Sequence, residues 1–237
     1  MKHHVFVIFC SFFIFFSCSK EATLPVHDDS YFNYFPLIPG AERIYQVTSI
    51  HIDAPTNIND TAIYFLREQV LDTIIDTLDY TIYLISQEKR TSDTLPWQHV
   101  QHIAIRKHQR KIVKIEDNMA YTLLQFPAST SITWDGNEYN NKAPEMYSYS
   151  DLSANYGHEN MILDSVLVVK QSFFESLYTY TFKEEQYAYG IGLCSKTDYV
   201  FESQPTHANI NINMPIKERI TYGYLHTYLL ISYSIPE

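Results

Sequence analysis

Residues Leu177–Lys183 have the sequence LYTYTFK, in which aromatic and polar side chains alternate with a period of two. Tyr178, Tyr180 and Phe182 fall on one face of such an extended chain, which is typical of an antiparallel strand with one buried and one wet face. Similar β-branched and aromatic runs, separated by turn residues, occur on both sides of it. They predict further strands near residues 42–53, 61–72, 79–89, 98–107, 111–116, 119–126, 164–171, 196–203 and 217–233.

No window shows sustained helical periodicity, and a composition of 46% hydrophobic and 15% aromatic residues can supply a core. We therefore predict an all-β fold: a single antiparallel curved meander, forming a half-open barrel or a two-layer sandwich, with few or no helices. Segment 138–163 is the least strand-like, and we expect a long excursion over the sheet with a short helix around Ser150–Tyr156, ended by Gly157. Gly223 predicts a bulge or bend in the last strand.

The N-terminus indicates export. A basic start precedes an apolar run, Val5–Phe16, and then Ser17-Cys18. This order is that of a secretory signal, and its run of about 12 residues is shorter than the roughly 20 that a membrane-spanning helix needs. A cysteine directly after a small residue resembles a bacterial lipobox, which implies cleavage between Ser17 and Cys18 and acylation of Cys18 with chains such as palmitate. A plain signal peptide that contains a cysteine is the alternative.

These features divide the chain into a lipoprotein signal peptide over residues 1–17, a tether over 18–33 and a single β domain over 34–237. The formal net charge of −10 argues against nucleic acid as a partner and against electrostatic attachment to anionic lipid. Membrane attachment would therefore depend on the acylated N-terminus, and the expected location is the bacterial cell envelope, at the outer membrane. Cys194 has no predicted disulfide partner, and its apolar neighbours predict a buried, unreactive thiol.

Catalytic, metal-binding and cofactor-binding signatures are missing from the sequence, so we predict no catalytic residue, no metal site, no cofactor and no enzyme activity. Ser86-Gln87-Glu88-Lys89 matches the Ser-x-x-Lys pattern of acyl enzymes. On a strand, however, residues three apart point to opposite faces. For the same reason His99 and His102 are not expected to share a metal ion unless a bulge intervenes.

Five Asp-Thr or Asp-Ser pairs precede an aliphatic residue and resemble the O-glycosylation acceptor of exported proteins in Bacteroidota-type bacteria. The candidate acceptors are Thr61, Thr73, Thr77, Thr94 and Ser165. The same pattern also occurs where a turn enters a strand, so both interpretations stay open.

The chain has 20 tyrosines, and tyrosine rings can stack on sugars. Most of them alternate within predicted strands and are explained as core or rim residues. Tyr147, Tyr149 and Tyr156 lie in the predicted excursion and are the candidate ligand-facing aromatics.

Three stretches resemble a group of small Bacteroidota-type lipoproteins of unknown function. They are Tyr34-Phe35-Pro36-Leu37 with Gly40 and Tyr45-Gln46-Val47, the turn Trp134–Asn140, and the passage Tyr187–Leu193. Arg43 and Cys194 stand where that group usually has apolar residues. The resemblance implies a lipid-anchored β domain and transfers no catalytic residue.

We expect a non-enzymatic, lipid-anchored envelope protein that binds a partner, such as an envelope protein or a glycan, or has a structural role. A second hypothesis is a carrier of an apolar ligand, such as an acyl chain, in a concave cavity lined by Tyr178, Tyr180 and Phe182. A third is a protein that binds or acts on glycans; an enzyme of that kind would need carboxylates converging in one cleft with shifted pKa values.

Overall fold

The computed structural model describes residues 29–75, 81–204, 211 and 213–236. They form one antiparallel sheet of twelve strands and three short 3-10 helices, so the predicted all-β class is confirmed. The strands are β1 (Glu42–Asp53), β2 (Ile58–Ile75), β3 (Thr81–Arg90), β4 (Gln98–His108), β5 (Lys111–Glu116), β6 (Met119–Gln125), β7 (Thr133–Asp135), β8 (Met146–His158), β9 (Met161–Glu175), β10 (Thr179–Ala188), β11 (Gly192–Glu202) and β12 (Tyr222–Ser234). The 3-10 helices are η1 (Asp29–Tyr34), η2 (Ala54–Thr56) and η3 (Ile216–Glu218).

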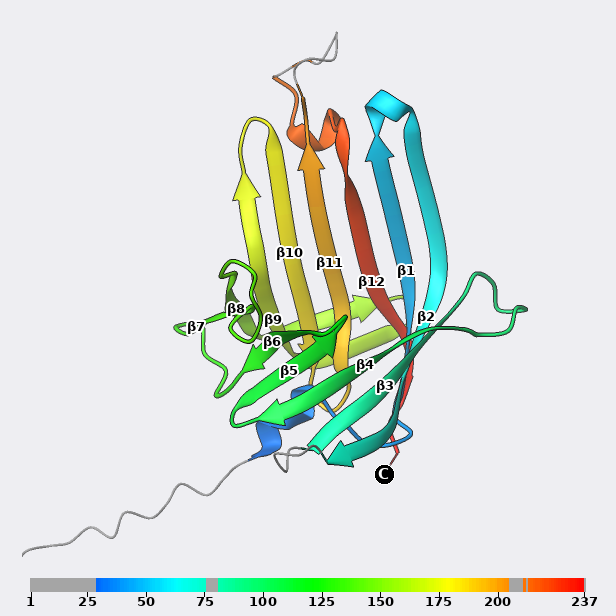
Figure 1. Cartoon of the computed structure of the whole chain (residues 1–237), viewed down its shortest axis with the longest axis vertical. Coiled ribbons are helices and arrows are strands. Elements are labelled where there is room, and N and C mark those ends of the chain that lie inside the picture. Colours follow the sequence, from blue (N-terminus) through cyan, green and yellow to red (C-terminus); the bar gives the residue numbers. More distant parts are fainter. Residues whose placement is uncertain (1–28, 76–80, 205–210, 212, 237) are drawn as a thin grey trace, which may run out of the picture.

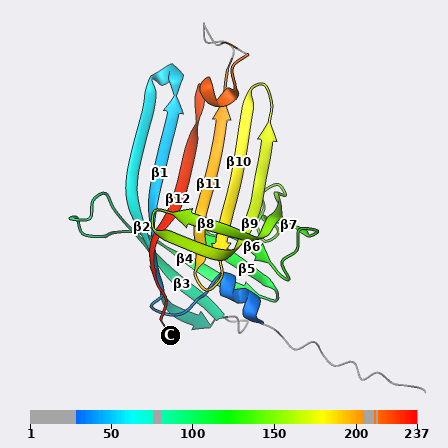
Figure 2. The ribbon, with the colours of Figure 1, turned by 180° about the vertical axis from the view of Figure 1, so that it is seen from behind.

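The strand order is that of a meander in which the first and last strands also pair with each other, β6-β5-β4-β3-β2-β1-β12-β11-β10-β9-β8-β7. The long strands β1, β2 and β9–β12 make a tall sheet, and β3–β6 cross in front of its lower half (Figure 1). Part of the β8–β9 hairpin crosses the opposite side (Figure 2). The lower half is thereby rolled into a nearly closed barrel, whereas the upper half stays an open sheet.

The two ends of the sheet meet where β6 approaches β7. The Thr122 amide donates to the Gly136 carbonyl oxygen at 2.9 Å, and the Trp134 Nε1–H donates to the Thr122 carbonyl oxygen at 3.1 Å. Trp134 also packs against Tyr147 and Tyr149 in the main core. These contacts explain how a short strand such as β7 can close the barrel.

The bottom of the barrel is closed by η1. Phe32 and Phe35 are buried in the main core, and the Tyr31 ring stacks on Phe126 with centroids 4.8 Å apart. Within the described residues, no helix is long and apolar enough to cross a membrane.

Three local predictions were wrong. Segment 138–163 is not an excursion, because most of it forms β8 and the start of β9, and Ser150–Tyr156 is strand rather than helix. Gly157 accordingly lies inside β8. Gly223 pairs without a register shift, and its φ of +147° reflects close packing instead of a bulge: a Cβ there would lie 2.2 Å from the Val200 carbonyl oxygen.

The LYTYTFK strand exists, but its aromatic face is turned away from the barrel interior. Tyr180 is buried against Phe201 and Ile216, and Phe182 packs against the same cluster. Tyr178 precedes β10 and is exposed. The side chains that point into the barrel are Lys183, Glu185 and Tyr187, from the opposite face of the strand.

Candidate functional site

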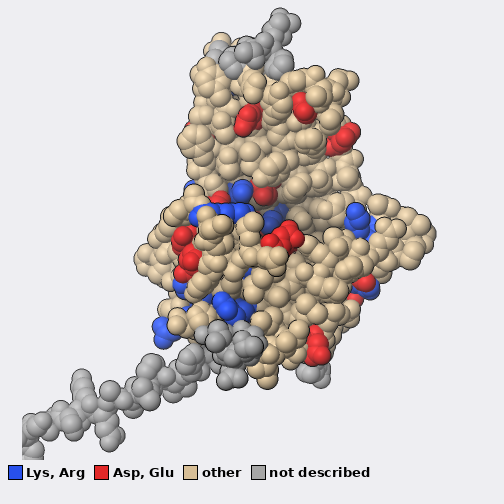
Figure 3. Space-filling view, in the orientation of Figure 1, with Lys and Arg blue, Asp and Glu red and all other residues tan. Residues whose placement is uncertain are grey.

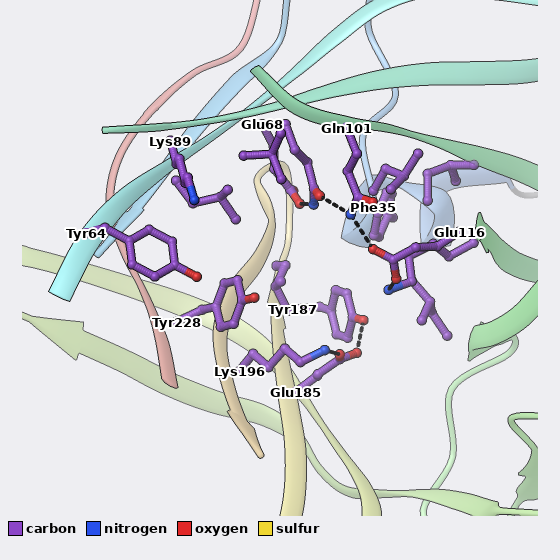
Figure 4. A pocket seen from close by; sticks show the side chains of 18 residues that line it. Phe35, Tyr64, Glu68, Lys89, Gln101, Glu116, Glu185, Tyr187, Lys196 and Tyr228 are labelled. Carbon is purple, nitrogen blue, oxygen red and sulfur yellow. Dashed lines mark hydrogen bonds and ion pairs between the residues drawn. The ribbon is translucent and has the colours of Figure 1, made fainter. Parts of the chain in front are cut away.

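The barrel encloses a cavity of about 270 Å³ (Figure 4). Its lining combines apolar side chains with charged side chains that come from strands on both walls. The lining comprises Phe35, Tyr64, Leu66, Glu68, Gln87, Lys89, Val100, Gln101, Ile103, Ile105, Lys114, Glu116, Leu123, Glu185, Tyr187, Leu193, Lys196 and Tyr228. Basic and acidic side chains are visible at the hollowed waist of the molecule, whereas the sheet above it shows few charges (Figure 3).

One wall carries a continuous chain of hydrogen bonds across β2, β3, β4 and β5. Gln87 Nε2 donates to Glu68 Oε1 at 2.7 Å, and Gln101 Nε2 donates both to Gln87 Oε1 at 2.8 Å and to Glu116 Oε1 at 2.7 Å. Lys114 Nζ completes the chain by donating to Glu116 Oε2 at 2.7 Å. Because each residue has the inward orientation on its strand, neighbouring strands place Glu68, Gln87, Gln101 and Glu116 in a row, with Lys114 beside Glu116 on β5.

The opposite wall carries a buried ion pair. Lys196 Nζ on β11 lies 3.1 Å from Glu185 Oε1 on β10, and the Tyr187 hydroxyl donates to Glu185 Oε2. Glu185 is only 4% exposed. Burial raises the pKa of its carboxyl group, but the Lys196 charge and the Tyr187 hydrogen bond outweigh that effect and hold the pKa below its ordinary value.

The partners of Glu185 shift in the opposite direction. Burial lowers the pKa of the Lys196 ammonium, but the Glu185 charge raises it above the ordinary value. Burial together with Glu185 raises the pKa of Tyr187 well above its ordinary range. At neutral pH this wall therefore presents one carboxylate, one ammonium and one neutral phenol.

Glu116 follows the same pattern on the facing wall. Burial raises the pKa of its carboxyl group, and the Lys114 charge with the hydrogen bonds from Lys114 and Gln101 lowers it further than burial raises it. Both central carboxyl groups thus stay ionised at neutral pH.

Tyr64, Tyr228 and Lys89 lie together at one side of the cavity, which is here called the mouth because Lys89 is exposed (Figure 4). Burial raises the pKa of Tyr228 to about 12, and Lys196 Nζ lies 5.8 Å from the centroid of its ring. Among the described residues, Lys89 makes no hydrogen bond or ion pair, and Glu68 has hydrogen bonds from Gln87 and Tyr45 but no cationic partner. One positive and one negative group are therefore available to a ligand at the mouth.

A β-bulge in β4 shapes this mouth. Gln87 pairs with Gln101 and Glu88 pairs with His99, so Val100 is the extra residue. The bulge lets Val100 and Gln101 both line the cavity, and it brings the His99 and His102 rings to a centroid distance of 4.5 Å on the exposed side. The prediction that these two histidines face opposite sides was wrong for this reason. No group of three or more metal-ligating side chains occurs in the described part of the chain.

A second hollow of about 260 Å³ adjoins the first. Five residues line both: Lys114, Glu116, Leu123, Glu185 and Lys196. Tyr147, one of the predicted ligand-facing aromatics, reaches this second hollow, and burial with Glu145 raises the pKa of its hydroxyl far above the ordinary value.

The other predicted site residues lie elsewhere. Tyr149 and Tyr156 are buried, and their hydroxyls donate to the carbonyl oxygens of Gln125 at 2.9 Å and Leu230 at 3.0 Å. The candidate acceptors Thr61, Thr73, Thr94 and Ser165 are all exposed, whereas Ser17, Cys18 and Thr77 lie outside the described residues. Cys194 is a buried free thiol, as predicted, and burial raises its pKa to about 12.

An acid–base catalyst of the predicted kind needs carboxyl groups that converge in one cleft and a raised pKa for the group that acts as the acid. Glu68, Glu116 and Glu185 do converge on one space. General acid catalysis by a carboxyl group, however, requires a raised pKa, and the pKa values of Glu116 and Glu185 are both lowered. Glu116 and Glu185 instead accept hydrogen bonds as ionised carboxylates, from Gln101 and Lys114 and from Tyr187 respectively.

No known protein-family model matches the chain, and neither does any curated protein. Its fold is similar to that in the crystal structure of a "putative lipoprotein" from Parabacteroides distasonis ATCC 8503, with a TM-score of 0.40 and 9% sequence identity. That match covers 85% of this chain and 98% of the other chain. The similarity lies in the backbone, and no site residue is transferred from it. The family membership suggested by the sequence stays a prediction.

Proposed function

We propose that this chain is a lipid-anchored protein of the bacterial cell envelope that binds a small, uncharged, hydroxylated ligand, such as a sugar ring, in the barrel cavity. The observation that carries the ligand proposal is the balanced polar lining. Three carboxylates (Glu68, Glu116, Glu185) face three ammonium groups (Lys89, Lys114, Lys196) in one enclosed space.

The charge balance favours a ligand without net charge. A phosphorylated ligand would be attracted by the lysines but repelled by an equal number of carboxylates. A divalent cation would be attracted by the carboxylates but repelled by an equal number of lysines. Hydroxyl groups, in contrast, both donate and accept hydrogen bonds, so they suit a lining that alternates carboxylate, amide and ammonium groups. Tyr64 and Tyr228 at the mouth supply aromatic faces on which a sugar ring can stack.

Size and desolvation weigh against an acyl chain. The cavity of about 270 Å³ is just below the roughly 300 Å³ at which pockets for drug-sized ligands begin, so it suits a ligand of one ring. An acyl chain would also have to displace water from ionised side chains, which costs several kcal/mol for each ion. The aromatics that the carrier hypothesis required, Tyr178, Tyr180 and Phe182, do not line this cavity.

Ligand binding is tested by urea unfolding of the purified chain with D-glucose, N-acetyl-D-glucosamine, glycine or palmitate added. A ligand present at ten times its Kd should raise the free energy of unfolding by about 1.4 kcal/mol. We expect at least one sugar to do so, and expect Tyr64→Ala to abolish the gain while Tyr178→Ala, at an exposed tyrosine outside the cavity, keeps it. Stabilisation by palmitate alone would favour the carrier hypothesis, and stabilisation by none of the four would leave a structural role.

The anchor is tested separately by mass analysis of the native protein and by fractionation of a Cys18→Ala variant. Acylation should be found on Cys18, and the variant should leave the membrane fraction. An intact, unacylated N-terminus would contradict the proposal.

A further inference from the structure

The closed end of the barrel, here called the base, is the end at which the chain arrives from Cys18. The base consists of η1, the β10–β11 turn at Tyr189, the end of β2 at Ile74 and Ile75, and the chain that follows β12. Both views place these segments at the same end of the molecule, opposite the open part of the tall sheet (Figures 1 and 2).

Large apolar side chains are exposed at the base. The exposed fractions are 54% for Ile74, 71% for Ile75 and 46% for Tyr189. Single exposed apolar residues are normal on a protein surface, but several gathered at one end are typical of an interaction surface. Tyrosine in particular prefers the interface between a membrane and water.

The aromatic part of the base is held rigidly. The Tyr189 hydroxyl accepts a hydrogen bond from Asn33 Nδ2 at 2.8 Å, and its ring contacts Tyr34 edge-on with centroids 5.2 Å apart. The Gly190 amide donates to the Asn33 carbonyl oxygen at 2.8 Å, which fixes the β10–β11 turn to η1. The aromatic rings therefore lose little conformational entropy when they bind a surface.

The length of chain between Cys18 and η1 indicates that the surface bound by the base is a membrane. Residues 18–28 lie between the acylated cysteine and η1, and a chain of that length spans at most about 40 Å when fully extended. An anchor at this distance keeps the base near the bilayer at an effective concentration in the millimolar range, so that contacts too weak to hold a free protein become occupied.

We propose that the base rests on the phospholipid surface, with the isoleucines at the end of β2 and the tyrosines of the base in the headgroup region, so that the cavity mouth and the open sheet face away from the membrane. The inference depends on the proposed acylation of Cys18 and adds an orientation to it. A net charge of −10 makes apolar contact, rather than attraction to anionic lipid, the source of the binding free energy.

The test uses the acylated full-length protein in phosphatidylcholine–phosphatidylethanolamine vesicles, with an environment-sensitive fluorophore on one introduced cysteine. Cys194 is fully buried and will not be labelled, and Cys18 is blocked by its acyl chain. The probe position is Ile75→Cys. The matched control is Ile63→Cys on the same strand, because Ile63 is 56% exposed but lies in the half of β2 beyond its pairing with β3.

We expect vesicles to raise the fluorescence of the Ile75→Cys probe severalfold and to leave the Ile63→Cys probe unchanged. Adding Ile74→Asp should reduce the Ile75→Cys signal although the protein still floats with the vesicles. Flotation without any rise at Ile75→Cys, or with an equal rise at both probes, would refute the orientation and leave the anchor intact. If the protein does not float with the vesicles because Cys18 is not acylated, both the proposed anchor and the proposed orientation are refuted. A rise that follows protein concentration instead of lipid would identify a second copy as the occupant and refute the inference.

Discussion

Replacing Lys196 by methionine should turn the Glu185–Lys196 pair from a stabilising into a destabilising element. The two charged atoms lie 3.1 Å apart, and at an effective dielectric constant of about 20 their attraction is about 5 kcal/mol. Breaking a buried pair by removing one partner costs about 3–5 kcal/mol, because the other charge stays buried. The Lys196 side chain is 26% exposed, so we expect the lower value, about 3 kcal/mol, at pH 7.

The pH dependence of this loss has a definite sign. In the natural protein the pKa of Glu185 is lowered by folding, so its contribution is present above the unfolded pKa and is lost as the pH falls through the folded pKa. Without Lys196, burial is the largest influence on the pKa of Glu185, and we expect it to outweigh the Tyr187 hydrogen bond and the Lys114 charge, so that the folded pKa lies above the unfolded value. The variant should then gain stability as the pH falls from 7 to 5, whereas the natural protein should not.

Urea unfolding at pH 7 and pH 5, followed by the fluorescence of the buried Trp134, measures both effects. Lys183→Met is the matched control, because Lys183 has a similar exposure of 27% but lies 3.9 Å from Glu145; its cost should stay below about 1 kcal/mol. The double variant Glu185→Gln with Lys196→Met should recover most of the loss. The reasoning is refuted if Lys196→Met costs no more than Lys183→Met, or if its stability falls between pH 7 and pH 5.

Three further experiments probe the fold. Cys194 should react with iodoacetamide at pH 8 on the order of 1,000-fold more slowly in the folded chain than in urea, because its thiol is buried and its pKa is raised to about 12; comparable rates would contradict this burial. Gly223→Ala should cost more than about 2 kcal/mol in urea unfolding, since its Cβ would meet a backbone oxygen 2.2 Å away, whereas Gly157→Ala, with nothing within 4 Å, should cost less than about 0.5 kcal/mol. The buried Arg43 guanidinium donates hydrogen bonds to the carbonyl oxygens of Ile191 and Pro36. Arg43→Met removes both donors and should lower the free energy of unfolding by about 2–4 kcal/mol. A loss below about 1 kcal/mol would show that water replaces the guanidinium as the donor.

The fold class could be predicted from the sequence because period-two alternation survives wherever a strand is regular. Strand β1 was predicted with its observed bounds, 42–53, and β5 likewise at 111–116. Strand β8 was missed because its pairing with β9 shifts register three times, between Tyr149 and Tyr156. Each shift interrupts the alternation, so the segment has the polar and irregular pattern of a loop.

The cavity could not be predicted for a different reason. The alternation in LYTYTFK indicates which side chains share a face, but not which face lines the barrel: the aromatic face packs against Phe201 and Ile216 outside the barrel, and the polar face turns inward. Glu116 and Glu185 lie 69 positions apart in the sequence and on opposite walls, and only the closure of the sheet brings both to one cavity. Lys183 and Glu185 share a strand face with Tyr187, and these charged residues indicate in the sequence that this face is polar.

The pairing of β1 with β12 has a consequence for biogenesis. The tall sheet is completed only when a segment near residue 45 meets a segment near residue 230, and such distant pairing is slow to form. During synthesis, the half of the meander that has already emerged must wait with an unfinished edge until β12 has been made. The last strand to be synthesised therefore sets the time at which the tall sheet can be completed.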